Sequence, residues 1–127
     1  MNIRPYIFTV IVVLAAAAAA FAHPLGNFSI NQYSRLEVSK DQIKIRQVLD
    51  LAEIPTFQEA SIIDTDKDGT LSPAELKVYA NAITPTYLDK LFLTVNGNAA
   101  AIRATNVTAA TETGAGGLQT IKIKWDL

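Results

Sequence analysis

The stretch at residues 64–75, which reads DTDKDGTLSPAE, restricts the fold of this 127-residue chain more than any other feature. It gathers four carboxylates within twelve positions, although only 18% of the chain is charged. Aspartates at alternate positions of a tight turn point inward together, and Gly69 supplies the positive φ that a sharp reversal needs. Carboxylates this close repel one another unless a cation lies between them, and Lys67 is the only basic residue in the stretch. The stretch therefore predicts a cation-binding loop in the middle of the chain.

The stretch resembles the calcium loop of the EF-hand family, in which twelve residues supply ligands from positions 1, 3, 5, 7, 9 and 12. Ca²⁺ takes about 6–8 oxygen ligands, and the resemblance implies that one ion binds here. Leu71, at position 8, is expected to turn back toward the core. The implied ligands are the side chains of Asp64, Asp66 and Asp68, the backbone carbonyl of Thr70, a water held by Ser72, and both carboxylate oxygens of Glu75.

A metal-free acidic turn is the alternative interpretation, because aspartate and glycine are common in turns. Ser72 and Glu75 also have the spacing of a capping box, which stabilises a helix start without any metal. The segment before the loop departs from the family pattern, since Thr56 and Glu59 occupy positions that are usually apolar. The family usually pairs two loops, and this sequence contains one. A single exported loop is typical of a structural or low-affinity calcium site, with a Kd of about 10⁻⁴–10⁻³ M.

The first 22 residues have the order of a secretory signal peptide. Arg4 precedes an uncharged run from Tyr6 to Ala22, which is apolar and ends in small residues. Cleavage after Ala22 would leave an exported domain at residues 23–127, in the periplasm or outside the cell. The alternative is a retained membrane anchor, because the run reaches the lower limit for a spanning helix, about 17 residues.

Charge and cysteine content exclude several classes of function. The formal net charge is -1, so the chain lacks the large single-sign field by which proteins bind nucleic acids or anionic membranes. The sequence contains no cysteine, which excludes disulfides, thiol nucleophiles and cysteine-ligated metals. An exported domain of about 100 residues without disulfides must be held together by its apolar core or by a metal.

Hydrophobic alternation and helical periodicity predict an α+β fold. Helical spacing follows Pro55 and again follows the acidic loop, and the second helix should end before Pro85, because the residue before a proline is pushed out of helical geometry. Asn96-Gly97 is the strongest two-residue hairpin signal. The predicted architecture is a small antiparallel β-sandwich with an EF-hand helix–loop–helix inserted at about residues 55–83. The predicted strands are residues 27–38, 43–51, 91–95, 99–105 and 118–127, and the predicted helices are residues 55–63 and 73–83.

Four aromatic residues fall on predicted apolar faces, and we interpret them as core residues rather than as the lining of a ligand pocket. They are Tyr33, Phe57, Tyr79 and Trp125. In the last predicted strand, Ile121, Ile123 and Trp125 alternate with charged residues, which predicts one buried face and one solvated face.

The sequence does not predict an enzyme. It contains none of the short motifs that mark metalloproteases, phosphate loops, dinucleotide sites or nucleophile elbows. Asp50 and Glu53 lie close together where a strand meets a helix, and we interpret them as a solvated pair rather than as an acid–base pair. His23 is the only histidine. After cleavage, its imidazole and the free amine could chelate Cu(II) or Ni(II), and an ordinary frayed terminus is the alternative.

A second resemblance is carried by HPLGNFSINQYSRLEV at residues 23–38 and VLDLAEIPTFQE at residues 48–59. These segments resemble the exported N-terminal region of bacterial nickel/cobalt transporters of the NicO type, over roughly residues 23–95. The resemblance implies an extracytoplasmic β-rich domain attached to a bundle of membrane helices that carries the transport activity. The chain also ends inside an apolar pattern at Leu127, so we expect it to be the front part of a longer protein.

Overall fold

The computed structural model describes residues 26–127, so the predicted signal peptide and His23 lie outside the described residues. In chain order the elements are β1 (Ile30–Val38), β2 (Ile43–Leu51), α2 (Glu53–Ile63), α3 (Pro73–Leu88), β3 (Leu93–Val95), β4 (Asn98–Ala100), β5 (Asn106–Thr113), the short 3-10 helix η1 (Ala115–Gly117) and β6 (Gln119–Asp126).

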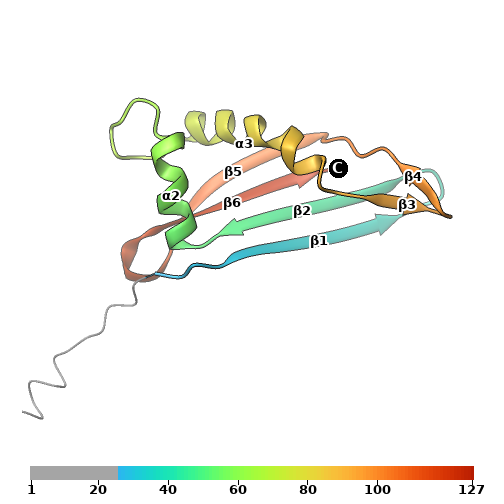
Figure 1. Ribbon diagram of the computed structural model, residues 1–127, viewed down its shortest axis with the longest axis horizontal. Coiled ribbons are helices and arrows are strands. Elements are labelled where there is room, and N and C mark those ends of the chain that lie inside the picture. Colours follow the sequence, from blue (N-terminus) through green and yellow to red (C-terminus); the bar gives the residue numbers. More distant parts are fainter. Residues whose placement is uncertain (1–25) are drawn as a thin grey trace, which may run out of the picture.

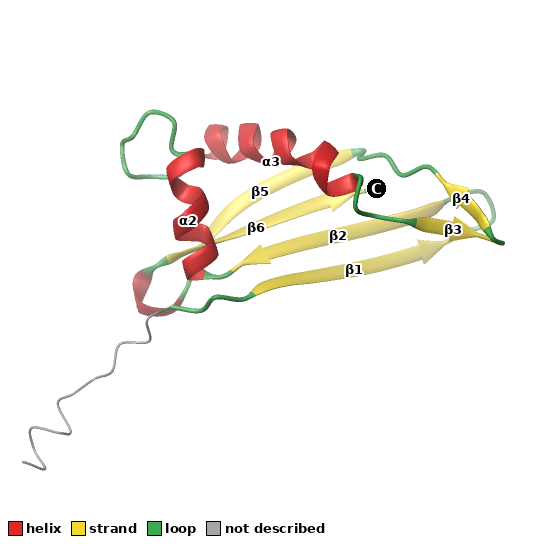
Figure 2. Ribbon diagram, in the orientation of Figure 1, coloured by secondary structure: helices red, strands yellow, loops and turns green. Residues whose placement is uncertain are grey.

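The main sheet has four antiparallel strands in the order β1-β2-β6-β5, and β3 and β4 form a separate two-stranded hairpin (Figure 1). Helices α2 and α3 lie over one face of the main sheet (Figure 2). The α+β class with antiparallel strands is therefore confirmed. The layer that covers the main sheet is helical, and the second sheet is small. No helix in the described residues is long and apolar enough to span a membrane.

The core lies between the centre of the sheet and the two helices. Ile121, Ile123 and Trp125 of β6 are completely buried, which confirms the face predicted from their alternation. Burying an isoleucine side chain contributes about 1.5–3 kcal/mol relative to leaving it in water. The other buried hydrophobic residues are Leu51 of β2, Ile63 of α2, and Leu76 and Ala80 of α3. The loop between the helices is thus flanked by core residues.

Helix α3 runs through Pro85 to Leu88, so the prediction that it ends before this proline is wrong. The packing of its last turn explains the difference. Tyr87 stacks on Trp125, with ring centroids 4.3 Å apart and ring planes 6° from parallel. The Trp125 Nε1–H donates a hydrogen bond of 2.8 Å to the Thr84 hydroxyl, which donates to the Ala80 carbonyl at 2.6 Å. These contacts offset the backbone hydrogen bond that the proline cannot make.

The start of α2 and the last third of the chain also differ from prediction. Helix α2 starts at Glu53 rather than Pro55, and Pro55 is tolerated because N–H groups in the first turn have no helical partner. The hairpin turn is confirmed, since Asn96 and Gly97 both have positive φ, 51° and 83°. The return strand β4 ends at Ala100, and the sequence interpretation missed β5 altogether. The core-facing positions of β5 hold mainly small residues, which give a weak hydrophobic pattern.

Two of the four predicted core aromatics are exposed. Tyr33 is 58% exposed, because it lies on the outer face of β1, and Phe57 on α2 is 75% exposed. Trp125 is buried as predicted. Tyr79 is partly buried against the core.

Candidate calcium site

The acidic loop connects the end of α2 to the start of α3 and is fixed at both ends (Figure 1). Ile63, the last residue of α2, is 1% exposed, and Leu76 in the first turn of α3 is 2% exposed. Leu71 packs against the same core, as its place in the loop predicted. The exposed part of the loop is therefore held between core contacts rather than being free at one end.

The structure brings the three loop aspartates together. One carboxylate oxygen from each of Asp64, Asp66 and Asp68 lies within 4.8 Å of the others, a spacing that would let them bind one metal ion. The chain reverses here through positive φ angles at Lys67 and Gly69, 60° and 81°. Nothing lies within 4 Å of the position of a Cβ on Gly69, so backbone conformation, rather than space, favours glycine there.

Backbone hydrogen bonds orient these carboxylates. Asp64 accepts from the N–H groups of Asp68 at 3.2 Å and Gly69 at 3.0 Å. Asp66 also accepts from the Asp68 N–H, at 3.2 Å. Asp68 accepts from both the N–H and the hydroxyl of Thr70, each at 2.7 Å. A carboxylate has about four lone-pair sites, so each of these groups keeps acceptor capacity for a cation.

Glu75 is directed to the helix start instead of the aspartate cluster. One of its carboxylate oxygens accepts from the Ser72 N–H at 3.0 Å and the Ser72 hydroxyl at 2.8 Å. The Ser72 hydroxyl accepts from the Glu75 N–H, which completes the capping box. The other oxygen accepts from the Thr65 N–H at 2.7 Å and its hydroxyl at 3.1 Å. Glu75 therefore closes the loop by linking its second residue to α3.

The surroundings of Glu75 and Asp66 shift the pKa values of these two groups in opposite directions. Hydrogen bonds from Ser72 and Thr65 stabilise the ionised carboxylate and lower the pKa of Glu75 to about 2. The Asp68 N–H lowers the pKa of Asp66, but desolvation and the neighbouring carboxylates raise it by more in total. The net result is a pKa for Asp66 above its ordinary value. A cation placed among the aspartates would relieve this repulsion.

The six predicted ligands thus divide into two groups. Asp64, Asp66 and Asp68 form the cluster, and the Thr70 side chain and N–H support it. Ser72 and Glu75 form the capping box. The acidic cluster and the capping box, which the sequence offered as competing interpretations, are present side by side. The assignment of all six residues to one calcium ion remains a prediction.

Sequence reasoning missed the hydrogen bonds by which three residues stabilise this region. Thr65 donates twice to Glu75, and its position between two aspartates gave no signal of that role. Thr56 is 3% exposed, and its hydroxyl donates to the Leu51 carbonyl at 3.0 Å, so it fills a core position as a satisfied polar residue. Tyr79 donates to Glu59 at 2.9 Å and connects the two helices.

The interpretation of Asp50 and Glu53 as a solvated pair is wrong for Glu53, which is only 6% exposed. Its carboxylate accepts from the Ala115 N–H at 2.6 Å and the Asn27 N–H at 3.0 Å. A Cβ on Gly114 would collide with this carboxylate. Glu53 therefore connects the start of β1, the start of α2 and the turn before β6, which is a structural role.

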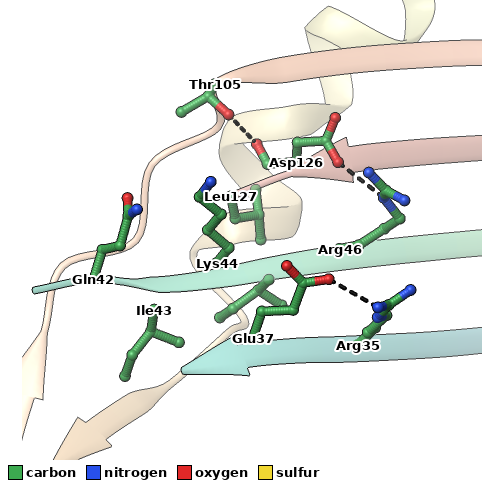
Figure 3. Close-up of a pocket in the computed structure, with 10 residues that line it drawn as sticks. Arg35, Glu37, Gln42, Ile43, Lys44, Arg46, Thr105, Asp126 and Leu127 are labelled. Carbon is green, nitrogen blue, oxygen red and sulfur yellow. Dashed lines mark hydrogen bonds and ion pairs between the residues drawn. The ribbon is translucent and has the colours of Figure 1, made fainter. Parts of the chain in front are cut away.

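A hollow of about 380 Å³ lies where the turn end of the β1–β2 hairpin meets the end of β6 (Figure 3). Four of its charged residues form two exposed ion pairs. Arg46 contacts Asp126 at 3.0 Å, and Arg35 contacts Glu37 at 3.1 Å. Exposed pairs of this kind contribute little to stability and are typical of a solvated face. The hollow therefore offers no arrangement that would activate a nucleophile.

No protein-family model, curated protein or solved structure matches this chain. Any statement about its function therefore depends on the loop geometry and on the sequence resemblances described above.

Proposed function

We propose that this chain binds one Ca²⁺ ion in the loop between α2 and α3, and that the ion stabilises the helix–loop–helix against the sheet. The observation that carries the proposal is the convergence of three aspartate oxygens within 4.8 Å. Their loop begins and ends at residues packed in the core. Carboxylate oxygens are the ligands that calcium prefers, and Mg²⁺ demands a smaller, octahedral shell.

Each ligand would have a distinct role. Asp64, Asp66 and Asp68 supply negative charge, and their oxygens are already oriented by backbone N–H groups. Thr70 would supply its backbone carbonyl, and Ser72 would hold a water. Glu75 would complete the shell from the first turn of α3 by turning away from its hydrogen bonds with Thr65 or Ser72, so that the ion links both helices. The proposed role is structural or regulatory, in an exported domain.

The expected stabilisation follows from mass action. At ~1 mM calcium and a Kd of ~0.1 mM, binding stabilises the folded state by about 1.4 kcal/mol. For a domain of this size, Tm should rise by roughly 5 to 10 °C. Thermal melts in calcium, magnesium and chelator would measure the shift, and calorimetry would measure the heat of binding. Magnesium should produce a smaller shift.

Matched variants assign the shift to the loop. Asp64→Ala and Glu75→Gln should abolish most of the calcium-dependent rise in Tm, whereas Asp41→Ala, which removes an exposed acid outside the loop, should preserve it. Asp64→Ala also removes acceptors for two backbone N–H groups. For that reason the quantity compared is the difference between calcium and chelator within each variant. Identical melts in calcium and chelator for the unmodified protein, with no heat of binding, would refute the proposal.

A second candidate function rests on the resemblance to NicO-type transporters. The two segments that carry this resemblance contact each other: Asn27 donates to Glu53 at 3.0 Å and accepts from the Ile54 N–H at 3.1 Å. A Cβ on Gly26 would lie 3.0 Å from the Ile54 side chain. The proposal is an extracytoplasmic domain of a nickel/cobalt transporter. Several apolar segments of about 20 residues encoded after Leu127 would support it, and a stop codon there would refute it.

A further inference from the structure

Strand β1 forms an open edge of the main sheet. Within residues 26–127 it pairs only with β2, and all nine of its residues are exposed. The opposite edge strand, β5, packs against α3. The pairing of β1 with β2 runs without a bulge from Ile30–Leu51 to Val38–Ile43, and β1 contains no proline. Bulges, prolines and covering elements protect many edge strands from further pairing, and within residues 26–127 β1 has none of them; its charged side chains are Arg35 and Glu37.

The hydrogen bonds at the two ends of the hairpin show which backbone groups of β1 are free. Ala52 donates to the Ser29 carbonyl at 3.0 Å, and Ser39 donates to the Gln42 carbonyl at 2.9 Å. Hydrogen-bonded pairs alternate along an antiparallel ladder, so the odd-numbered residues of β1 face β2. The even-numbered residues therefore direct one N–H and one C=O each toward the open edge. They are Ile30, Gln32, Ser34, Leu36 and Val38.

Three of these five residues present apolar side chains on the face of the sheet that α2 and α3 cover elsewhere. Ile30 lies opposite the buried Leu51, so the even-numbered side chains share the core side of the sheet. Helices α2 and α3 leave these side chains of β1 exposed. Ile30, Leu36 and Val38 are 56%, 53% and 74% exposed. The free edge thus combines unpaired backbone groups with exposed apolar side chains along about 30 Å of strand.

We propose that a second copy of this chain pairs with β1 along this edge, antiparallel, about a two-fold axis at Ser34. The main sheets of the two copies would then form one continuous eight-stranded sheet. An isologous interface of this kind closes on itself as a dimer. The cross-strand pairs are Ile30 with Val38, Gln32 with Leu36, Ser34 with Ser34, Asn31 with Glu37, and Tyr33 with Arg35 of the second copy.

The number of paired residues selects this register, and the charges are compatible with it. It pairs all nine residues of β1, and all its outward N–H and C=O groups find partners. An axis at Arg35 or Glu37 would place like charges opposite each other, which is destabilising. An axis at Tyr33 would move Val38 beyond the end of the partner strand. An axis at Leu36 would place Arg35 opposite Glu37, which is favourable, but it would pair only residues 34–38 of each copy. In the proposed register, the Arg35 guanidinium instead lies opposite the Tyr33 ring, where a cation–π contact is favourable.

Single cysteines test the register, because the sequence contains none of its own. Ser34→Cys would place two thiols on the axis, with Cα atoms about 5.5 Å apart, within the range that a disulfide spans. Gln32→Cys is the control on the same face, and its thiols would lie about 13 Å apart along the strand. Under mild oxidation, protein purified after expression of the full chain should cross-link at least about tenfold faster with Ser34→Cys. Equal rates for the two variants would overturn the register.

Charge substitutions test the interface without covalent chemistry. Gln32→Lys with Leu36→Lys places like charges opposite each other twice, whereas Gln32→Lys with Leu36→Glu places opposite charges there. Light scattering across a concentration series should show a dimer for the unmodified protein. The first double variant should dissociate at least about tenfold more readily than the second. A monomer at every concentration for the unmodified protein, or equal dissociation of the two double variants, would overturn the proposal.

Discussion

At the scale of single residues, Glu53 joins three segments that are far apart in the sequence. It belongs to α2, yet its carboxylate accepts hydrogen bonds from Asn27 and from Ala115, 62 positions away in the sequence. Hydrogen bonds from its own backbone N–H, Ala115 and Asn27 lower the pKa of Glu53. The ionised form is thus the one that fits the fold.

This shift predicts loss of stability in acid. A pKa lowered from 4.5 in the folded state means that the unfolded chain binds more protons as pH falls through this range. The stabilising contribution of Glu53 is therefore complete above pH 4.5 and is lost at lower pH. Melts from about pH 6 to about pH 3 should show Tm falling less steeply for Glu53→Gln than for the unmodified protein. Parallel curves would show that other carboxyls cause the acid sensitivity.

Gly114 is the residue that makes room for this carboxylate. A Cβ there would collide with Glu53 and would lie 2.8 Å from the Thr120 side chain. Gly114→Ala should therefore cost roughly 1–3 kcal/mol, as other overpacked sites do, measured by urea unfolding. In a Glu53→Ala background the same change should cost less, because one of the two collisions is absent. Equal costs in both backgrounds would contradict the steric explanation.

At the scale of elements, α3 is secured at both ends by side-chain hydrogen bonds. Its first turn carries the capping box of Ser72 and Glu75. Near its other end, the Thr84 hydroxyl accepts a hydrogen bond from the indole N–H of Trp125. The Tyr87 hydroxyl accepts a hydrogen bond of 2.8 Å from the Gln47 side chain. The helix is therefore positioned by contacts with β6 and β2 that no local propensity encodes.

Removing the acceptor of the buried indole should destabilise the docking of α3. Thr84→Val preserves shape but leaves the Trp125 Nε1–H without its partner, so the free energy of unfolding should fall by about 1–3 kcal/mol. Thr84→Ser preserves the hydroxyl and serves as the control, with a smaller loss. Denaturant unfolding followed by tryptophan fluorescence would compare the two variants. A valine variant as stable as the serine variant would show that this hydrogen bond is unimportant.

Local patterns predicted some elements and failed on others for identifiable reasons. The strand at Ile121–Trp125 was predicted correctly, because its large apolar residues alternate with charged ones. Strand β5 was missed, because a strand made mainly of threonine and alanine, with a single valine, resembles a loop. The end of α3 was misplaced at Pro85, because the stacking of Tyr87 depends on a residue far away in sequence.

The candidate site was predictable to a similar degree. The spacing of the aspartates and Gly69 identified the loop, since ligand position and backbone reversal are both local properties. The hydrogen bonds of Thr65 to Glu75 could not be anticipated, because threonine at that position has no required role. The place of Tyr33 depends on which side of the sheet the helices cover, which a strand pattern alone does not determine.

At the scale of the whole molecule, burial is concentrated at the centre of the sheet. Among residues 26–127, strands β2 and β6 contribute four of the seven buried hydrophobic residues, and β3 and β4 contribute none. Amides in β6 should therefore exchange with deuterium at the rate of global unfolding, whereas those in the β3–β4 hairpin should exchange faster through local opening. Exchange resolved by nuclear magnetic resonance would measure both. Equal protection of the hairpin and β6 would contradict this distribution of stability.

Helix α3 also links the acidic loop to the only tryptophan of the chain. The helix has sixteen residues, a rod of about 24 Å, with the loop at one end and the Tyr87–Trp125 stack at the other. A tilt of α3 at the loop would change the overlap of the Tyr87 and Trp125 rings and the solvent exposure of the indole. We therefore expect the intrinsic fluorescence of this tryptophan to report the orientation of α3 without an added dye.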